Sequence, residues 1–168
     1  LRSELGIIDG LADPKVVVLD PCCGTGAYLC SVLRRIHKTF SEKGADDLAA
    51  HDLKKAAIQR IYGFEIMPAP FVVAHLQLGL LMESMGAPFD EKRDERPGVF
   101  LTNSLTGWDL ALDKQKKQLP SPIPEFNSEK FAAEKVKREK PILVILGNPP
   151  YNAFAGLSPN EEGNLIAD

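Results

Sequence analysis

The stretch VVVLDPCCGTGAYL, residues 16–29, limits the possible folds of this chain more than any other part of it. Val16 to Leu19 are aliphatic and end at Asp20-Pro21, which predicts a short buried strand of a parallel sheet. Gly24-Thr25-Gly26 follows, and apolar residues then recur at helical spacing from Tyr28 to Ile36. A strand, a glycine turn and a helix in this order can hold a cofactor at the carboxyl end of the strand.

The glycine pattern departs from the dinucleotide-binding fingerprint, because Leu29 stands in place of its third glycine. This departure favours a nucleoside cofactor that lacks a pyrophosphate. An ordinary glycine-rich turn between a strand and a helix is the alternative at this point.

The composition is that of a globular protein: 168 residues, 44% of them hydrophobic, with a net charge of −3. We expect one domain or part of one, and the absence of an initial methionine indicates a piece of a longer chain. A chain with a net negative charge does not attract nucleic acid electrostatically. Any contact with nucleic acid would therefore be local or made by other parts of a longer protein. No apolar run is as long as a membrane span and no signal peptide precedes the first strand, so we expect a cytoplasmic protein without a membrane partner.

The three cysteines, Cys22, Cys23 and Cys30, have neither CxxC spacing nor a nearby pair of histidines. We therefore expect no metal site. The cysteines are interpreted as reduced, buried small residues.

The pattern along the chain predicts an α/β fold, a parallel sheet flanked by helices with right-handed crossovers. Residues 1–13 form the lead-in, 14–151 the sheet and helices, and 152–168 a loop or disordered tail. We expect buried strands over residues 16–19, 61–66, 99–102 and 142–146, and helices over 27–43, 45–60, 68–85 and 128–140.

Several side chains of these helices have expected roles. Residues 71–85 are apolar on most sides and should pack on the sheet, with His75 as a structural residue. Ser128 is the expected N-cap of the last helix, and Glu134 and Arg138 are spaced for an ion pair. The basic residues of that helix are interpreted as a solvated face, with a DNA-facing surface as the alternative: Lys130, Lys135, Lys137 and Arg138.

Polar residues mark the carboxyl ends of all four strands, where ligands of parallel sheets bind. Glu65 is placed to accept hydrogen bonds from two ribose hydroxyls, or else it faces water. Asn103 can bond an adenine edge through its donor and acceptor, or else it forms a turn.

The last strand ends in Asn148-Pro149-Pro150-Tyr151, the most specific motif of the chain. Two prolines fix the backbone, so the Asn148 side chain and the Pro149 carbonyl can form a rigid pair of acceptors. Tyr151 offers a flat ring for stacking. This arrangement suits a planar substrate that carries an amino group.

With these motifs, the chain resembles the S-adenosylmethionine-dependent methyltransferases that modify adenine N6 in DNA. Asp20-Pro21-Cys22-Cys23-Gly24-Thr25-Gly26 is similar to their first motif and Asn148-Pro149-Pro150-Tyr151 to their catalytic motif, in the gamma order. The surrounding segments, GLADP and LVILGNPPYN, resemble the corresponding sequences of large single-chain restriction-modification enzymes of prokaryotes. The resemblance runs from about Leu11 to Asn152 and implies the N-terminal portion of a Rossmann-like, class I methyltransferase fold.

The resemblance also implies roles for the marked residues. Binding of S-adenosyl-L-methionine is implied for Asp20, Gly24, Thr25, Gly26, Glu65, Ile66 and Asn103. At Asn103 the family usually has an acid. Binding of the target amino group is implied for Asn148 and Pro149, with Tyr151 stacking on a base flipped out of duplex DNA.

Two other functions fit the same motifs. NPPY also occurs in methyltransferases that act on a protein glutamine or on ribosomal RNA. The chain can also be a cofactor-binding scaffold without activity of its own, since the family sheet has seven strands and only four are predicted here.

Overall fold

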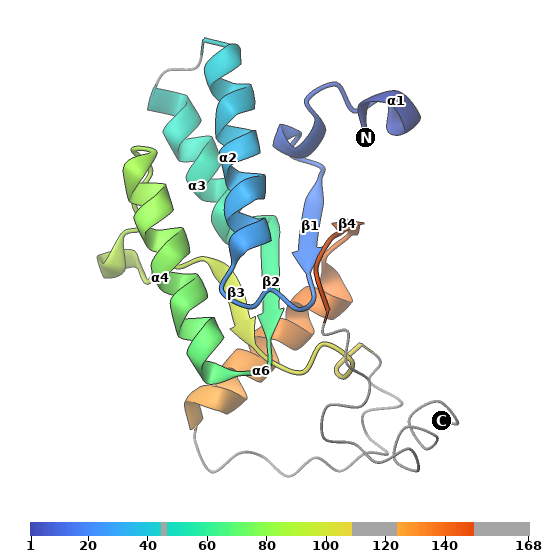
Figure 1. Ribbon diagram of the computed structural model, residues 1–168, viewed down its shortest axis with the longest axis vertical. Helices are drawn as coiled ribbons and strands as arrows, with labels where there is room; N and C mark the ends of the chain where they lie inside the picture. Colours follow the sequence, from blue (N-terminus) through green and yellow to red (C-terminus); the bar gives the residue numbers. More distant parts are fainter. Residues whose placement is uncertain (45–46, 109–123, 150–168) are drawn as a thin grey trace.

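The computed structural model describes residues 1–44, 47–108 and 124–149. Four parallel strands form one sheet in the order β3-β2-β1-β4: β1 (Val17–Asp20), β2 (Ile61–Glu65), β3 (Gly98–Leu101) and β4 (Ile142–Ile145). Helices α2 (Ala27–Glu42), α3 (Asp47–Gln59) and α4 (Pro68–Ser84) cover one face, and α6 (Pro124–Glu139) covers the other (Figure 1). The predicted α/β fold with a parallel sheet is confirmed.

Short elements precede and connect these layers. They are helix α1 (Arg2–Leu5), which ends at Gly6 in the left-handed conformation, and the 3-10 turns η1 (Gly10–Ala12) and η2 (Glu91–Arg93). Helix α2 ends before Gly44, whose φ of +72° is typical of a glycine that ends a helix.

The two faces of the sheet have separate apolar cores because side chains alternate along each strand. Val16 and Val18 pack with Leu33 and Ile36 of α2 and with Leu53 of α3. The opposite core is formed against α6 by Val17, Leu19, Tyr62, Phe64, Ala133 and Val136. Buried strands therefore stand at the centre of the sheet, as their aliphatic runs predicted.

The amino ends of β1 and β2 are joined by Arg60. One of its guanidinium nitrogens, Nη1, donates to the carbonyls of Asp13 at 2.8 Å and Val16 at 2.9 Å, and more weakly to Leu11 at 3.5 Å. Arg60 thus fixes the chain before β1 against the start of β2.

The β4 strand differs from the prediction of a fully buried strand. Leu143 is 45% exposed and Ile145 is 66% exposed. β4 stands at the end of the strand order and pairs with β1 alone, so no neighbouring strand covers its outer side within the described residues. Its register with β1 shifts between Val17 and Val18, which face Ile142 and Val144.

Helix α4 packs on the sheet through one face, not most of its surface. Ala74, Leu78, Leu81 and Met82 are buried. The apolar side chains that remain exposed are Val72, Val73, Leu76 and Leu80.

In the part of the chain that the structure describes, no helix combines the length and apolarity needed to cross a membrane.

His75 of α4 has the predicted structural place. The centre of its ring lies 4.6 Å from that of Phe71 in a tilted arrangement, and its Nε2 lies 3.2 Å from the carbonyl of Val99 in β3. Burial lowers the pKa of His75, which favours the neutral ring expected in a packed helix.

Helix α6 begins at Pro124 rather than at the predicted Ser128. Proline suits the first turn of a helix because its missing N–H would have no partner there. Ser128 is therefore not the N-cap, and its hydroxyl donates to the carbonyl of Glu125 inside the helix. The predicted ion pair between Glu134 and Arg138 is confirmed at 3.2 Å.

Candidate functional site

A cleft of about 620 Å³ opens at the carboxyl ends of the strands. It joins the loops that follow β1, β2, β3 and β4, which confirms that the four strand ends meet at one place. The predicted site residues that line it are Gly24, Glu65, Ile66, Asn103, Asn148 and Pro149. Asp20, Thr25 and Gly26 do not line it, and Tyr151 lies outside the described residues.

The loop after β1 turns sharply through its glycines. Gly24 and Gly26 have φ values of +54° and +84°, which residues with a side chain rarely adopt. A Cβ at Gly26 would lie 3.3 Å from the Cβ of Ala74, so the absence of a side chain also lets α4 approach the loop.

Asp20 closes β1 and is fully buried beneath this loop. Its Oδ1 accepts from the N–H of Cys22 at 3.1 Å, whereas its Oδ2 has no hydrogen-bond partner among the described residues. Burial raises the pKa of Asp20, the Cys22 hydrogen bond opposes this, and the nearby Glu65 carboxylate adds to it. A buried acceptor without a partner is costly, so Asp20 favours a donor group nearby.

Glu65 ends β2 and is 9% exposed, so the alternative that it faces water is wrong. Its Oε2 accepts from the N–H of Gly24 at 2.9 Å. Its Oε1 accepts from the N–H groups of Ile66 at 2.9 Å and Met67 at 2.8 Å. A carboxylate oxygen has two lone pairs, so Oε2 keeps one acceptor position for a ligand in the cleft.

Asn103, which follows β3, forms a turn, and its bond to an adenine edge stays a prediction. Its Oδ1 accepts from the N–H of Leu105 at 2.9 Å and forms a turn. The residue also lines the cleft, and its Nδ2 group makes no hydrogen bond within the described ranges. It can therefore present a donor to a ligand.

The segment after β4 approaches the loop after β1 closely. A Cβ at Gly147 would lie 2.6 Å from Oδ1 of Asp20, closer than real Cβ atoms come. The next two residues, Asn148 and Pro149, line the cleft. Gly147 thus allows the ends of the first and last strands to meet.

Some residues of the cleft carried no signal in the sequence beyond their place near a strand end. Apolar side chains at its mouth come from Met67 and Leu105, which are 59% and 87% exposed. The remaining lining residues are Pro21, Cys22, Phe64, Pro70 and Ser104. The wall is mainly apolar with a few polar groups, as in many small-molecule sites.

Lys137 is the most consequential residue that the sequence interpretation missed. It is 6% exposed, so neither a solvated face nor a DNA-facing surface describes it. Its Nζ donates to the carbonyls of Asn103 and Thr106, both at 2.7 Å, next to the cleft.

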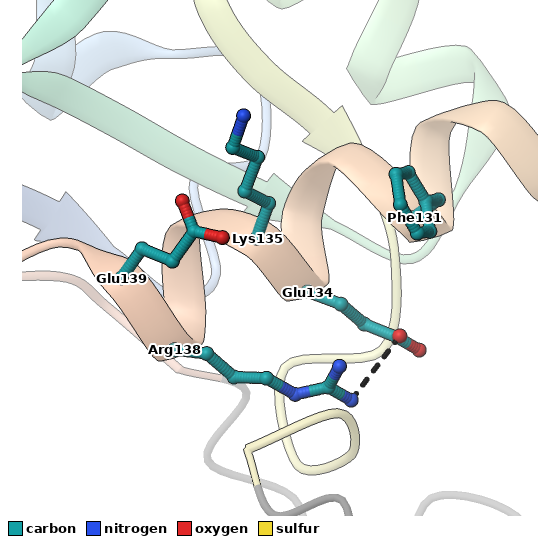
Figure 2. Close-up of a pocket in the computed structure, with 5 residues that line it drawn as sticks. All are labelled: Phe131, Glu134, Lys135, Arg138 and Glu139. Atoms are coloured by element: carbon teal, nitrogen blue, oxygen red, sulfur yellow. Dashed lines mark hydrogen bonds and ion pairs between the residues drawn. The ribbon is translucent and has the colours of Figure 1, made fainter.

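A smaller hollow of about 230 Å³ lies on α6 (Figure 2). It is lined by Phe131, Glu134, Lys135, Arg138 and Glu139, and Glu134 and Arg138 form their ion pair there. None of the predicted site residues lines it.

Across residues 1–44, 47–108 and 124–149, no three His, Cys, Asp or Glu side chains are grouped to hold a metal ion.

No protein-family model matches the chain. It is 28% identical over 155 residues to the adenine-specific methyltransferase PglX of Streptomyces coelicolor, a match that covers 82% of this chain and 12% of that protein. The likeness to this methyltransferase is weak in sequence and local in extent.

Solved structures show the same fold. The type ISP restriction-modification enzyme LlaGI, a nuclease-deletion mutant in complex with a DNA substrate mimic, matches with a TM-score of 0.64 and 21% identity over 90% of this chain and 11% of its own. The ATP-dependent type ISP enzyme LlaBIII bound to DNA has a TM-score of 0.61 and 23% identity, over 92% of this chain and 9% of its own. DrdV in complex with DNA has a TM-score of 0.58 and 21% identity, over 85% and 11%.

Proposed function

We propose that this chain is the cofactor-binding and catalytic part of a methyltransferase that transfers a methyl group from S-adenosyl-L-methionine to N6 of adenine in DNA. The observation that carries the proposal is the cleft itself. It brings the glycine loop after β1, Glu65, and the Asn148-Pro149 segment to one place. The likeness to PglX supports adenine as the target, and the sheet order supports the N-terminal portion of a Rossmann-like, class I methyltransferase fold.

The residues around the loop after β1 fit such a cofactor. Asp20 does not line the cleft, but its buried, unpartnered Oδ2 beneath the loop after β1 would favour the positively charged methionine part. Glu65 keeps an acceptor position on Oε2 for a ribose hydroxyl, and Ile66 offers an apolar surface at the cleft for the adenine ring. Gly24, Thr25 and Gly26 would shape the loop, and Asn103 would donate to the cofactor adenine through Nδ2.

The residues after β4 would hold the substrate. The Asn148 side chain and the Pro149 carbonyl would accept hydrogen bonds from the target amino group and orient its lone pair. S-adenosyl-L-methionine would supply a methyl group on a positively charged sulfur. The amine gains positive charge as it reacts, so two fixed acceptors stabilise the transition state more than the ground state.

Several parts of this function would depend on residues beyond those that line the cleft. We infer that DNA is the partner, with the target adenine flipped out of the duplex and stacked on Tyr151. We also infer a place in a restriction-modification system of a prokaryotic cytoplasm, because the structural neighbours are restriction-modification enzymes.

The test is a methyl-transfer assay on the intact natural protein with S-adenosylmethionine labelled in the methyl group. Duplex DNA, ribosomal RNA and total protein would be offered separately, and the labelled product identified after digestion. We expect label in N6-methyladenine of DNA. Label in protein glutamine or RNA would replace the proposed substrate, and cofactor binding without transfer to any of the three would indicate a binding scaffold.

A further inference from the structure

We propose that Lys137, on α6, is a positioning residue that holds the β3 side of the cleft in the shape that binds the cofactor. This inference rests on the proposed function. It assigns a role to a helix on the opposite face of the sheet from α2 and α4.

The ammonium group of Lys137 binds a short segment, residues 102–106, through three hydrogen bonds. It donates to the carbonyls of Asn103 and Thr106, each at 2.7 Å, and to Oγ1 of Thr102 at 3.3 Å. Three acceptors within five residues fold the segment around a single charge. Such charge-assisted hydrogen bonds are shorter and stronger than neutral ones.

This segment forms one wall of the cleft. Asn103, Ser104 and Leu105 all line it. The Ser104 hydroxyl donates to the carbonyl of Pro21, so the same segment also contacts the loop after β1. Holding residues 102–106 therefore holds the polar group of Asn103 and the apolar side chain of Leu105 against the place where the cofactor would bind.

Lys137 also supports the floor of the cleft. Its ammonium lies 4.8 Å from the centre of the Phe64 ring, and Phe64 is a fully buried residue that lines the cleft. A cation over an aromatic ring is attracted to it. One side chain thus fixes both the wall after β3 and a residue of β2.

Because Lys137 is buried, losing any of these contacts would be costly. Lys137 is 6% exposed, and a buried ammonium must be compensated by acceptors. An apolar replacement would leave two backbone carbonyls without this donor, and the segment would rearrange to reach water. We therefore expect looser binding of the cofactor rather than a direct effect on methyl transfer.

Arg60 offers a matched control. It also donates to backbone carbonyls, those of Asp13 and Val16, but at the amino ends of the strands and away from the cleft. Replacing either residue by methionine removes a cation that binds backbone oxygens, from a buried position at Lys137 and a partly buried one at Arg60. The two changes should cost similar stability but differ in their effect on the cleft.

The experiment measures the dissociation constant of S-adenosylmethionine by calorimetry in the intact natural protein and in its Lys137→Met, Lys137→Arg and Arg60→Met variants. Thermal unfolding and amide hydrogen exchange of residues 102–106 are measured on the same samples. We expect Lys137→Met to weaken binding about ten-fold or more, the scale of one lost charge-assisted hydrogen bond. It should also raise exchange in the segment, and kcat at saturating cofactor should stay within a few-fold of the unchanged protein.

Arg60→Met should lower thermal stability and leave the dissociation constant unchanged. Lys137→Arg keeps the charge with a different geometry, so it should restore part of the affinity. Unchanged affinity in Lys137→Met would overturn the proposal, as would equal losses in Lys137→Met and Arg60→Met. If Lys137→Met does not fold, faster exchange of residues 102–106 in Lys137→Arg with unchanged affinity would overturn it. Failure of the unchanged protein to bind the cofactor would instead overturn the proposed function.

Discussion

The carboxylate of Glu65, at the end of β2, accepts a hydrogen bond of 2.9 Å from the backbone N–H of Gly24 in the loop after β1. The same carboxylate accepts from Ile66 and Met67 through its other oxygen. Glu65 therefore fixes the shape of the loop before any ligand arrives. A site arranged in advance loses less free energy to ordering when it binds.

Replacing Glu65 tests this arrangement. Glu65→Ala should weaken binding of S-adenosylmethionine about 10- to 150-fold, because hydrogen bonds to a charged group contribute roughly 1.5–3 kcal/mol. Calorimetry on the intact protein measures it. Hydrogen exchange of the Gly24 amide should rise in the same variant, since its acceptor is gone. A folded Glu65→Ala protein with unchanged affinity would remove Glu65 from the cofactor site.

A second prediction concerns the contact between the ends of β1 and β4. Gly147→Ala would place a Cβ 2.6 Å from Oδ1 of Asp20, so one strand end must move. We expect a loss of roughly 1–3 kcal/mol in local stability, typical of overpacking, together with lower methyl transfer. Hydrogen exchange of β1 and β4 and the labelled-methyl assay measure the two effects.

Gly79→Ala provides the control for this change. Gly79 lies in α4, and a Cβ there would meet nothing within 4 Å. Alanine favours a helix by about 0.5–1 kcal/mol over glycine, so this variant should be as stable as the original or more so, with normal activity. Equal behaviour of Gly147→Ala and Gly79→Ala would show that the strand ends tolerate a side chain.

Most helices and strands of the fold could be predicted from local sequence patterns. Aliphatic runs ending in Pro21 or before Gly147 predicted strands because buried parallel strands need such runs. The exposure of β4 could not be predicted, because isoleucine is usually buried and Ile145 is exposed here. Its exposure follows from the place of β4 at the end of the strand order, which is a property of the whole sheet. The same limit applies to Leu76 and Leu80, which are apolar but lie on the outer face of α4.

The residues that line the cleft were predicted where they stand at strand ends, whereas Lys137, which contacts the cleft wall from α6, was missed. Glu65 and Asn148 were found because a parallel sheet places the carboxyl ends of its strands together. Lys137 was read as a surface lysine because its neighbours on α6, Lys135 and Arg138, are also basic. Its burial depends on where α6 crosses the sheet, and no local pattern encodes that.

The cysteines should take no part in catalysis. Burial raises the pKa of the Cys23 thiol to about 12, and it raises that of Cys22 as well. Both thiols therefore stay protonated at neutral pH and are poor nucleophiles. A Cys22→Ala, Cys23→Ala double variant that stays folded should keep methyl transfer in the intact protein. Complete loss of transfer in the folded double variant would indicate a covalent mechanism through a thiol.

The raised pKa of Cys23 also predicts a dependence of stability on alkaline pH. An unfolded thiol titrates near its ordinary value of 9.0, below its value in the fold. The contribution of Cys23 to stability is therefore complete below about pH 9 and is lost as the pH rises toward 12. Replacing Cys23 by alanine should flatten the loss of hydrogen-exchange protection in β1 over this range. An unchanged slope would show that the thiol titrates alike in both states.

The last prediction concerns Asn148 in the intact protein. Its side chain and the Pro149 carbonyl would stabilise positive charge that develops on the amine only during the reaction. Removing one preorganised group of this kind costs about 2.7–4 kcal/mol, or roughly 10²–10³ in rate. Asn148→Ala should lose at least that much in single-turnover rate on adenine-containing DNA, with cofactor affinity largely kept because Gly24 and Glu65 are unchanged. Asn148→Asp should be milder, since it keeps an acceptor at the same reach, and near-normal rates for Asn148→Ala would exclude this mechanism.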